Sequence, residues 1–267
     1  MGNLTGPTRD LGAKLDVFGG PTHIGTNTAL IGKYQGYAGL TGATAACGRS
    51  TTCASIFDTR WANAVAYVSP TWGGFSFSGA YVADENKTAE SADNVATART
   101  TGYDVGARWE GYGFMVGAAY NWAQVGNIAG TKVDNIRIGG SYAGGWGSVR
   151  AMWEATRLEQ IANFAGASFN DDVQQKFGVG ATFNVGKAAL LAQYYQALES
   201  DNRNNNGAWL AEVGVQYSLS KRTMLKAVYA YLDNEANSAA DFGVNAIGQT
   251  GTGATLQGVQ MGVRHAF

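Results

Sequence analysis

The sequence has 267 residues, a formal net charge of −1 and 15% charged residues, against roughly 25% in an average soluble domain. It contains 38 Gly, 3 Pro and 12% aromatic residues, and its mean hydropathy is −0.14. This balance gives no electrostatic reason to expect nucleic-acid binding and disfavours disorder. Because no run approaches the roughly 20 apolar residues of a membrane helix, a helical membrane protein is excluded.

The first part of the chain, residues 1–59, shows no alternation of apolar and polar side chains and is rich in Gly and Asn. We expect a loop segment there, with a short helical turn from Leu11 to Val17. Cys47 and Cys53 lie close together in a Gly/Ser/Thr-rich stretch, which would suit a disulfide in an oxidising compartment; two free thiols are the alternative. The N-terminus lacks the charged and apolar regions of a signal peptide, so we expect a mature protein or a missing start.

From about residue 60 the sequence repeats one pattern. A segment of about ten alternating residues is followed by a short turn, a second such segment and a longer polar connection. About eleven strands follow from this pattern, each longer than the usual five or six residues. The short turns are expected near Pro70, Gly111, Gly144, Gly186 and Ser220.

The two faces of these strands differ in charge. One face is apolar and almost uncharged, with aromatic residues near the strand ends. The other carries Arg108, Glu110, Arg137, Arg150, Glu154, Lys176, Glu212, Lys226 and Arg264. These features predict an antiparallel transmembrane β-barrel with an apolar outer band and a polar lumen that these charged residues face. A soluble β-sandwich also alternates, but the strand lengths and the uniform placement of charge disfavour it.

The end of the chain carries the most specific pattern. Val259, Met261, Val263, His265 and Phe267 share one face of a final strand. The stretch "GVRHAF" resembles the C-terminal strand of Gram-negative general porins of the β-proteobacterial type, and residues 217–234 resemble their penultimate hairpin. The resemblance implies a sixteen-stranded, trimeric barrel in the outer membrane, in contact with lipid and lipopolysaccharide. It also implies that the assembly machinery reads the terminal Phe267.

The resemblance assigns the two parts of the chain as well. Residues 1–59 correspond to a constriction-type loop that folds into the barrel, and residues 60–267 to strands of a single domain. The pore constriction would be formed by Asp10 and Asp16 on one wall and by Arg60 on the other. The eleven strands would be the sixth to the sixteenth, so we expect an N-terminal truncation. Closure into a smaller barrel, by pairing of residues 61–69 with the last strand, is the alternative.

The sequence contains no catalytic or metal-binding arrangement. His23 and His265 are the only histidines, and they lie far apart in the sequence. We therefore expect no enzyme activity, cofactor, metal or nucleic-acid partner. The expected function is passive diffusion of ions and small hydrophilic solutes through a channel whose ion preference stays open. The alternatives are a barrel that serves only as a structural or adhesive anchor and a substrate-specific channel.

Overall fold

The computed structural model describes residues 2–19, 24–34, 60–83, 101–125, 131–164, 167–243, 247 and 251–266. The elements in these ranges are β1 (Gly2–Thr5), α1 (Pro7–Leu15), the 3₁₀-helix η1 (Asn27–Ala29), β2 (Arg60–Val68), β3 (Phe75–Ala83), β4 (Thr101–Gly111), β5 (Phe114–Val125), β6 (Thr131–Gly144), β7 (Gly147–Phe164), β8 (Ala167–Val185), β9 (Ala188–Ala197), β10 (Ala208–Ser218), β11 (Thr223–Asn234) and β12 (Thr255–His265). Neither helix in the described part of the chain is long and apolar enough to cross a membrane.

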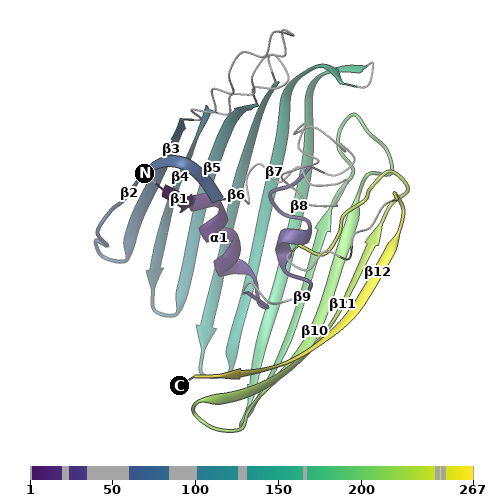
Figure 1. The fold of residues 1–267 in the computed structure, drawn as a ribbon. Helices are drawn as coiled ribbons and strands as arrows, with labels where there is room; N and C mark the ends of the chain where they lie inside the picture. The colour runs from purple at the N-terminus through teal and green to yellow at the C-terminus, as the bar shows by residue number, and fades with distance from the viewer. Residues whose placement is uncertain are drawn as a thin grey trace.

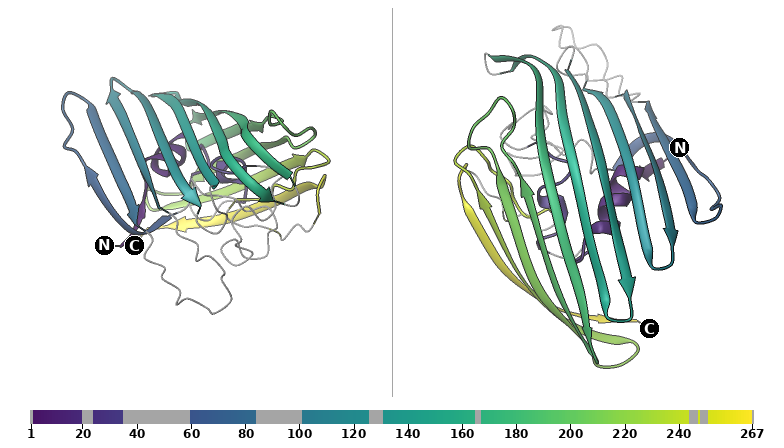
Figure 2. Two further views of the ribbon diagram at one scale, coloured as in Figure 1. Left: turned by 90° about the horizontal axis from the view of Figure 1, so that it is seen from above. Right: turned by 180° about the vertical axis from the view of Figure 1, so that it is seen from behind.

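All strands belong to one antiparallel sheet whose spatial order follows the chain from β1 to β12 (Figure 1). From β2 to β12 neighbours pair as successive hairpins, which is the simplest way to build a curved antiparallel wall. β1 pairs with β2, although α1 and η1 lie between them in the chain. Seen from above, the sheet curves around α1 and η1, which lie on its concave face (Figure 2). Within the described ranges, β1 and β12 form the two edges of the sheet, and β2 pairs with β1 and β3. The smaller closed barrel is therefore not formed by these residues.

The convex face of the sheet is apolar and exposed. Side chains at alternate described positions of β2 to β12 point outward, and Val179 and Met261 are 56% and 78% exposed. The same positions would form the core of a soluble sandwich, but here they cover the outside of a single wall. A continuous exposed apolar face is typical of a surface that contacts lipid. The predicted all-β antiparallel fold is confirmed.

Aromatic rings gather near both ends of the strands on the convex face. Near the short turns, Phe114 packs on Tyr142 with ring centroids 4.5 Å apart. Near the opposite ends, the centroid distances are 5.5 Å for Tyr103 and Trp122 and 5.0 Å for Trp209 and Tyr231. Amphipathic rings prefer the two boundaries between lipid and water, so these positions match the two girdles of a membrane barrel.

Two details of the N-terminal part differ from the expectation. The helix occupies Pro7–Leu15 rather than Leu11–Val17, because Pro7 is favourable at the first helical position. In addition, Gly2–Thr5 forms a short strand that pairs with β2, so the sheet has one strand more than the eleven expected. The division at residue 59 stays a prediction, since residues 35–59 lie outside the described ranges.

Candidate functional site

Two stretches that follow β1 fill part of the concave face. We call residues 7–19 and 24–34 together the inward segment. It contains α1 and η1, which run across the inner side of the sheet in both views of Figure 2. Leu15, Leu30 and Ile31 of this segment are buried in one apolar cluster with Met152 and Tyr195 of the wall. Each fully buried side chain of this kind contributes about 1.5–3 kcal/mol, so apolar packing alone provides a substantial docking energy.

Glycines on the wall make room for these apolar side chains. A methyl group in place of the Gly117 hydrogen would come within 2.9 Å of Leu11 Cδ1, and one at Gly214 within 2.7 Å of Phe18 Cε1. Both approaches are closer than real side chains show, so Leu11 and Phe18 would have to shift if larger residues replaced these glycines. Further glycines of the same kind are Gly106 below Pro7, Gly139 below Leu15 and Gly180 below Val17. The wall glycines therefore form a shallow track for the segment.

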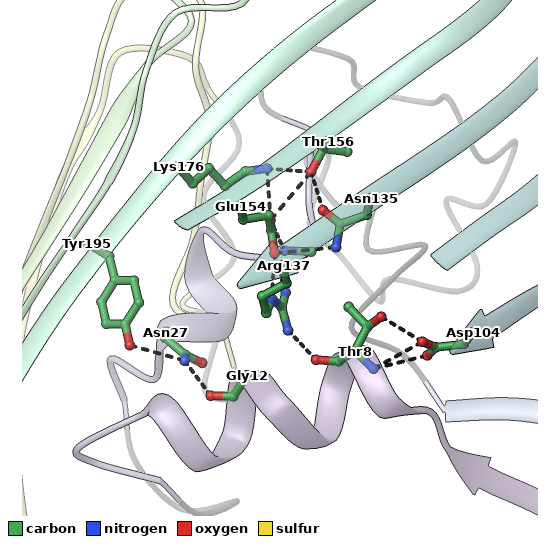
Figure 3. Close-up of polar contacts among 11 residues, drawn as sticks. Thr8, Gly12, Asn27, Asp104, Asn135, Arg137, Glu154, Thr156, Lys176 and Tyr195 are labelled. Atoms are coloured by element: carbon green, nitrogen blue, oxygen red, sulfur yellow. Dashed lines mark hydrogen bonds and ion pairs between the residues drawn. The ribbon is translucent and has the colours of Figure 1, made fainter. Parts of the chain in front are cut away.

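The start of α1 is capped by a residue from another strand. The N-cap position is Gly6, which has no side chain to accept a bond from the helix. Asp104 of β4 replaces it: its carboxylate accepts the Thr8 backbone N–H at 3.1 Å and the Thr8 hydroxyl at 2.6 Å. A carboxylate at this position both satisfies an unpaired helix donor and interacts favourably with the helix dipole. Asp104 thereby fixes the position of the helix start on the wall (Figure 3).

A buried charge cluster continues from this point. Arg137 of β6, Glu154 of β7 and Lys176 of β8 lie side by side in register on three adjacent strands. Arg137 Nε donates to Glu154 at 2.7 Å, and Lys176 Nζ donates to Glu154 at 3.1 Å and to Thr156 Oγ1 at 2.7 Å. Figure 3 shows the cluster directly beside α1. Two of its members also bind the inward segment.

Arg137 and Glu154 are these two members, and each bonds to a backbone atom of the inward segment. Arg137 Nη1 donates to the Thr8 carbonyl oxygen at 2.6 Å, and Glu154 Oε1 accepts the Gly32 backbone N–H at 2.7 Å. The side chains of Arg137 and Glu154 are fully buried. The cluster is therefore a contact between wall and segment.

Asp16 closes the turn after α1. Its carboxylate accepts the backbone N–H of Phe18 at 2.9 Å and of Asn27 at 3.0 Å. Burial raises the pKa of Asp16 from 3.8 to about 6, although these bonds and the nearby Arg150 guanidinium favour the charged form. The expectation that Asp16 lines an open wall is wrong for this structure, because the residue is buried inside the segment. Its role here is to shape the segment.

Wall residues of β9 to β12 hold the remainder of the segment. Gln193 accepts the Val17 backbone N–H at 3.0 Å, donates to the Gly25 carbonyl oxygen at 3.2 Å and also donates to Glu212. Gln260 accepts the Ile24 backbone N–H at 3.1 Å. These anchors extend from the middle of the sheet to its last strand, so most of the curved wall takes part in docking.

A second group of charges stays accessible on the solvent side of α1. Arg108 of β4 pairs with Asp10 at 2.8 Å and with Glu110 at 2.6 Å, and Lys14 lies 4.0 Å from Glu110. The side chains of Asp10 and Glu110 are each 50% exposed. We call Asp10, Lys14, Arg108 and Glu110 the exposed charge cluster. Its charges come from both wall and segment, so their spacing depends on how the segment is docked.

The charged residues expected on the polar face share the concave face, but their surroundings differ. Arg137, Glu154, Lys176 and Glu212 are buried beneath the inward segment, whereas Arg108 and Glu110 are accessible. Arg150 donates to the Asp16 carbonyl oxygen. Arg60, Lys226 and Arg264 are partly or fully exposed. Cys47, Cys53 and Phe267 lie outside the described residues.

Sequence reasoning missed the anchors Asp104, Gln193 and Gln260 and the glycine track. Asp104 and Gln193 follow the alternation on the polar face, but nothing in the pattern distinguishes them from ordinary polar positions. The available signal was the recurrence of glycine on that same face, for example at Gly106, Gly117 and Gly139. A wall that faces only water does not need glycine, whereas a wall that a chain segment approaches closely does.

The comparison with known proteins identifies the family. The sequence pattern of the Gram-negative porin family matches residues 1–237 of this chain. The chain belongs to the Gram-negative porin family. The porin chain accordingly localises to the outer membrane.

Individual porins are similar over different lengths. The chain is 28% identical over 209 residues to outer membrane porin protein 32 of Delftia acidovorans. The matched stretch covers 77% of this chain and 56% of that protein. The chain thus spans little more than half the length of this curated relative. The solved structure of an anion-selective porin from Comamonas acidovorans is 26% identical in sequence and has a TM-score of 0.70. The match covers 100% of this chain and 73% of that porin chain.

A more distant porin shares the fold. OmpT of Vibrio cholerae is 14% identical, with a TM-score of 0.62 over 99% of this chain and 74% of its own. A trimer form of OmpT is 16% identical, with a TM-score of 0.56 over 79% of this chain and 66% of its own. The matched proteins are porins rather than enzymes.

Proposed function

We propose that this porin forms a water-filled channel through which ions and small hydrophilic solutes diffuse passively, without enzymatic turnover. The observation that carries the proposal is the inward segment, which the wall holds across a concave, charged face that is shielded from lipid by the apolar convex face. A barrel that served only as an anchor would have no reason to hold charges of both signs at an accessible position on its inner side. The exposed charge cluster is the proposed constriction, with Asp10 and Arg108 in direct contact.

We further propose that the channel prefers anions. Among the described residues of α1 and of the concave face, the accessible basic side chains outnumber the acidic Asp10 and Glu110. The basic ones are Arg9, Lys14, Arg60, Arg108, Arg150, Lys226 and Arg264. An excess of one sign of charge raises the local concentration of the opposite ion in a narrow water-filled space. The similar porin from Comamonas acidovorans, which is named as anion-selective, supports this reading.

Planar-bilayer recording tests both proposals. Stepwise conductance is expected, and the reversal potential in a salt gradient should have the sign of an anion-preferring pore. Arg108→Gln should reduce the anion preference and Asp10→Asn should increase it. Both changes should be larger at about 0.1 M salt than at 1 M, because screening weakens charge effects. A protein that inserts but never conducts would support the anchor alternative, and saturation by one solute would support a substrate-specific channel.

We also propose that the protein works as a homotrimer, in contact with outer-membrane lipid and lipopolysaccharide. The trimer form of OmpT, which shares the fold, supports this proposal. We propose in addition that the outer-membrane assembly machinery recognises the terminal Phe267. Trimers that resist mild detergent on a native gel are expected, and Phe267→Ala should lower the amount inserted into the outer membrane. A monomer under all mild conditions would contradict the trimer.

A further inference from the structure

We propose that Glu154 is the positioning residue of the channel, because it ties both ends of the inward segment to one point of the wall. The inference rests on the proposed channel function and deepens it. The alternation of the strand predicted that Glu154 lines the lumen. We assign it instead the role of a buried tether between wall and segment. Through the segment it sets where the exposed charge cluster lies.

The tether consists of a continuous set of bonds. At the start of the segment, the Thr8 carbonyl oxygen accepts from Arg137, and Arg137 donates to Glu154 Oε2. At the end of the segment, the Gly32 backbone N–H donates to Glu154 Oε1. One carboxylate thus joins two points of the segment that are distant in sequence. Loss of this carboxylate would weaken both attachments together.

The surroundings of Glu154 show that it does not line the water-filled space. Its side chain and that of Arg137 have no exposed surface, and Lys176 is 1% exposed. Ions cannot reach these groups directly. Buried charges are costly unless they are paired and hydrogen-bonded, and the backbone of the inward segment supplies two of the bonds that complete the cluster. The stability of the cluster and the docking of the segment therefore depend on each other.

Arg137 and Lys176 both contact Glu154, so removing the charge of Glu154 leaves these two cations without the carboxylate that they share. Without the carboxylate, Arg137 and Lys176 would repel each other and would be stabilised by access of water. Water reaches them only when the segment moves away from the wall. Such movement carries Asp10 and Lys14 of α1 away from Arg108 and Glu110 on β4. The accessible charges then change their spacing although none of them has been altered.

The test is single-channel recording of Glu154→Gln. We expect a several-fold increase in brief closing events and a shift of the reversal potential toward zero. The matched control is Arg157→Gln on the same strand. Arg157 pairs with Asp134 at 2.7 Å on β6, like the Arg137–Glu154 pair, but on the convex face and away from the segment. The control should show the same closing events and the same reversal potential as the wild type.

A second variant keeps the proposal testable if Glu154→Gln does not fold. The triple variant Arg137→Met, Glu154→Leu, Lys176→Met replaces the cluster by apolar residues, an exchange that buried ion networks often tolerate. It removes the tether without leaving a buried charge, so it should fold and should show the same closures and shifted reversal potential. A folded triple variant with wild-type closures and selectivity overturns the proposal. A wild-type protein that does not conduct refutes the proposed channel instead.

Discussion

Val17 of the inward segment lies directly over Gly180 of β8, and no side chain would fit between them. A methyl group at Gly180 would overlap Val17 Cγ2, whereas its contacts with the neighbouring strand, 3.2 Å to Gln193 Cβ and 3.3 Å to the Ala192 carbonyl oxygen, would be tight but less severe. The absence of a side chain at position 180 therefore matters because of the segment.

The first prediction follows from this contact. Gly180→Ala should destabilise docking of the segment by about 1–3 kcal/mol, the usual cost of adding a methyl group to a packed site. Combining it with Val17→Ala should recover most of that loss, because the smaller side chain makes room. Unfolding free energies of the two single variants and the double variant measure the coupling.

The control for this prediction is Gly79→Ala. Gly79 lies on the convex face, where a methyl group would meet Val105 at an ordinary distance of 3.6 Å. It should leave stability nearly unchanged. Equal losses at both glycines, or no rescue by Val17→Ala, would show that the clash lies in the sheet.

The second prediction concerns pH. Burial raises the pKa of Asp16 from 3.8 to about 6, so the folded protein holds this proton more tightly than the unfolded chain. Stability should therefore fall as pH rises from about 4 to about 6, by roughly 3 kcal/mol at most, and stay level above that. Thermal unfolding midpoints across this range, compared with those of Asp16→Asn, provide the measurement. The Asn variant should show a smaller slope, and an unchanged slope would assign the effect to another group.

The third prediction concerns the cap of α1. Asp104→Ala removes the acceptor of the Thr8 backbone N–H and of the Thr8 hydroxyl. We expect a loss of about 0.5–2 kcal/mol, as for other helix N-caps, concentrated in the first turn of α1. Amide hydrogen exchange should become faster there and remain unchanged in the strands. Uniformly faster exchange would indicate that Asp104 stabilises the wall instead.

The fourth prediction concerns the turn between β4 and β5. Tyr112 and Gly113 both have positive φ angles, 53° and 83°, and Tyr112 is 94% exposed. A non-glycine residue is unfavourable in this conformation by about 1–2 kcal/mol, and Asn tolerates it better than Tyr. Tyr112→Asn should therefore raise the unfolding free energy slightly, while Gly113→Ala should lower it. Denaturant unfolding compares the two, and a loss in Tyr112→Asn would reveal a contact made by the ring in the membrane boundary.

The fifth prediction tests the two faces in a bilayer. Single cysteines at Val116 and Val179 should react with a lipid-soluble thiol reagent, because both side chains are exposed on the convex face. Cysteines at Ser76 and Gln216, which alternate onto the concave face, should react only with a water-soluble reagent. The reverse pattern would contradict the assignment of faces.

The strands and their faces could be predicted because a two-residue period is a local property of the sequence. Tyr103, Val105 and Trp109 identify the outer face of β4 without any knowledge of the rest of the chain. The short turns were equally local: glycine or proline marks those near Pro70, Gly111, Gly144 and Gly186, and polar residues mark the one near Ser220.

What covers the concave face could not be predicted in the same way. Alternation places Glu154 and Arg108 on the same side of the sheet, but one becomes buried and the other accessible. The difference depends on where the inward segment lies, which is decided by contacts between residues more than a hundred positions apart, such as Gly32 and Glu154. Asp16 was misassigned for the same reason. Its surroundings come from the fold of the segment itself.

The polar anchors of the wall bind the backbone of the inward segment. Asp104, Arg137, Glu154, Gln193 and Gln260 all bond to N–H or C=O groups, which every residue except proline supplies alike. The ion pairs that Asp10 and Lys14 of α1 make with the wall are partly exposed, so they contribute little to this attachment. Mutation can therefore exchange them without changing what the wall binds. A porin built this way can acquire a new solute preference through a few substitutions while keeping the same frame.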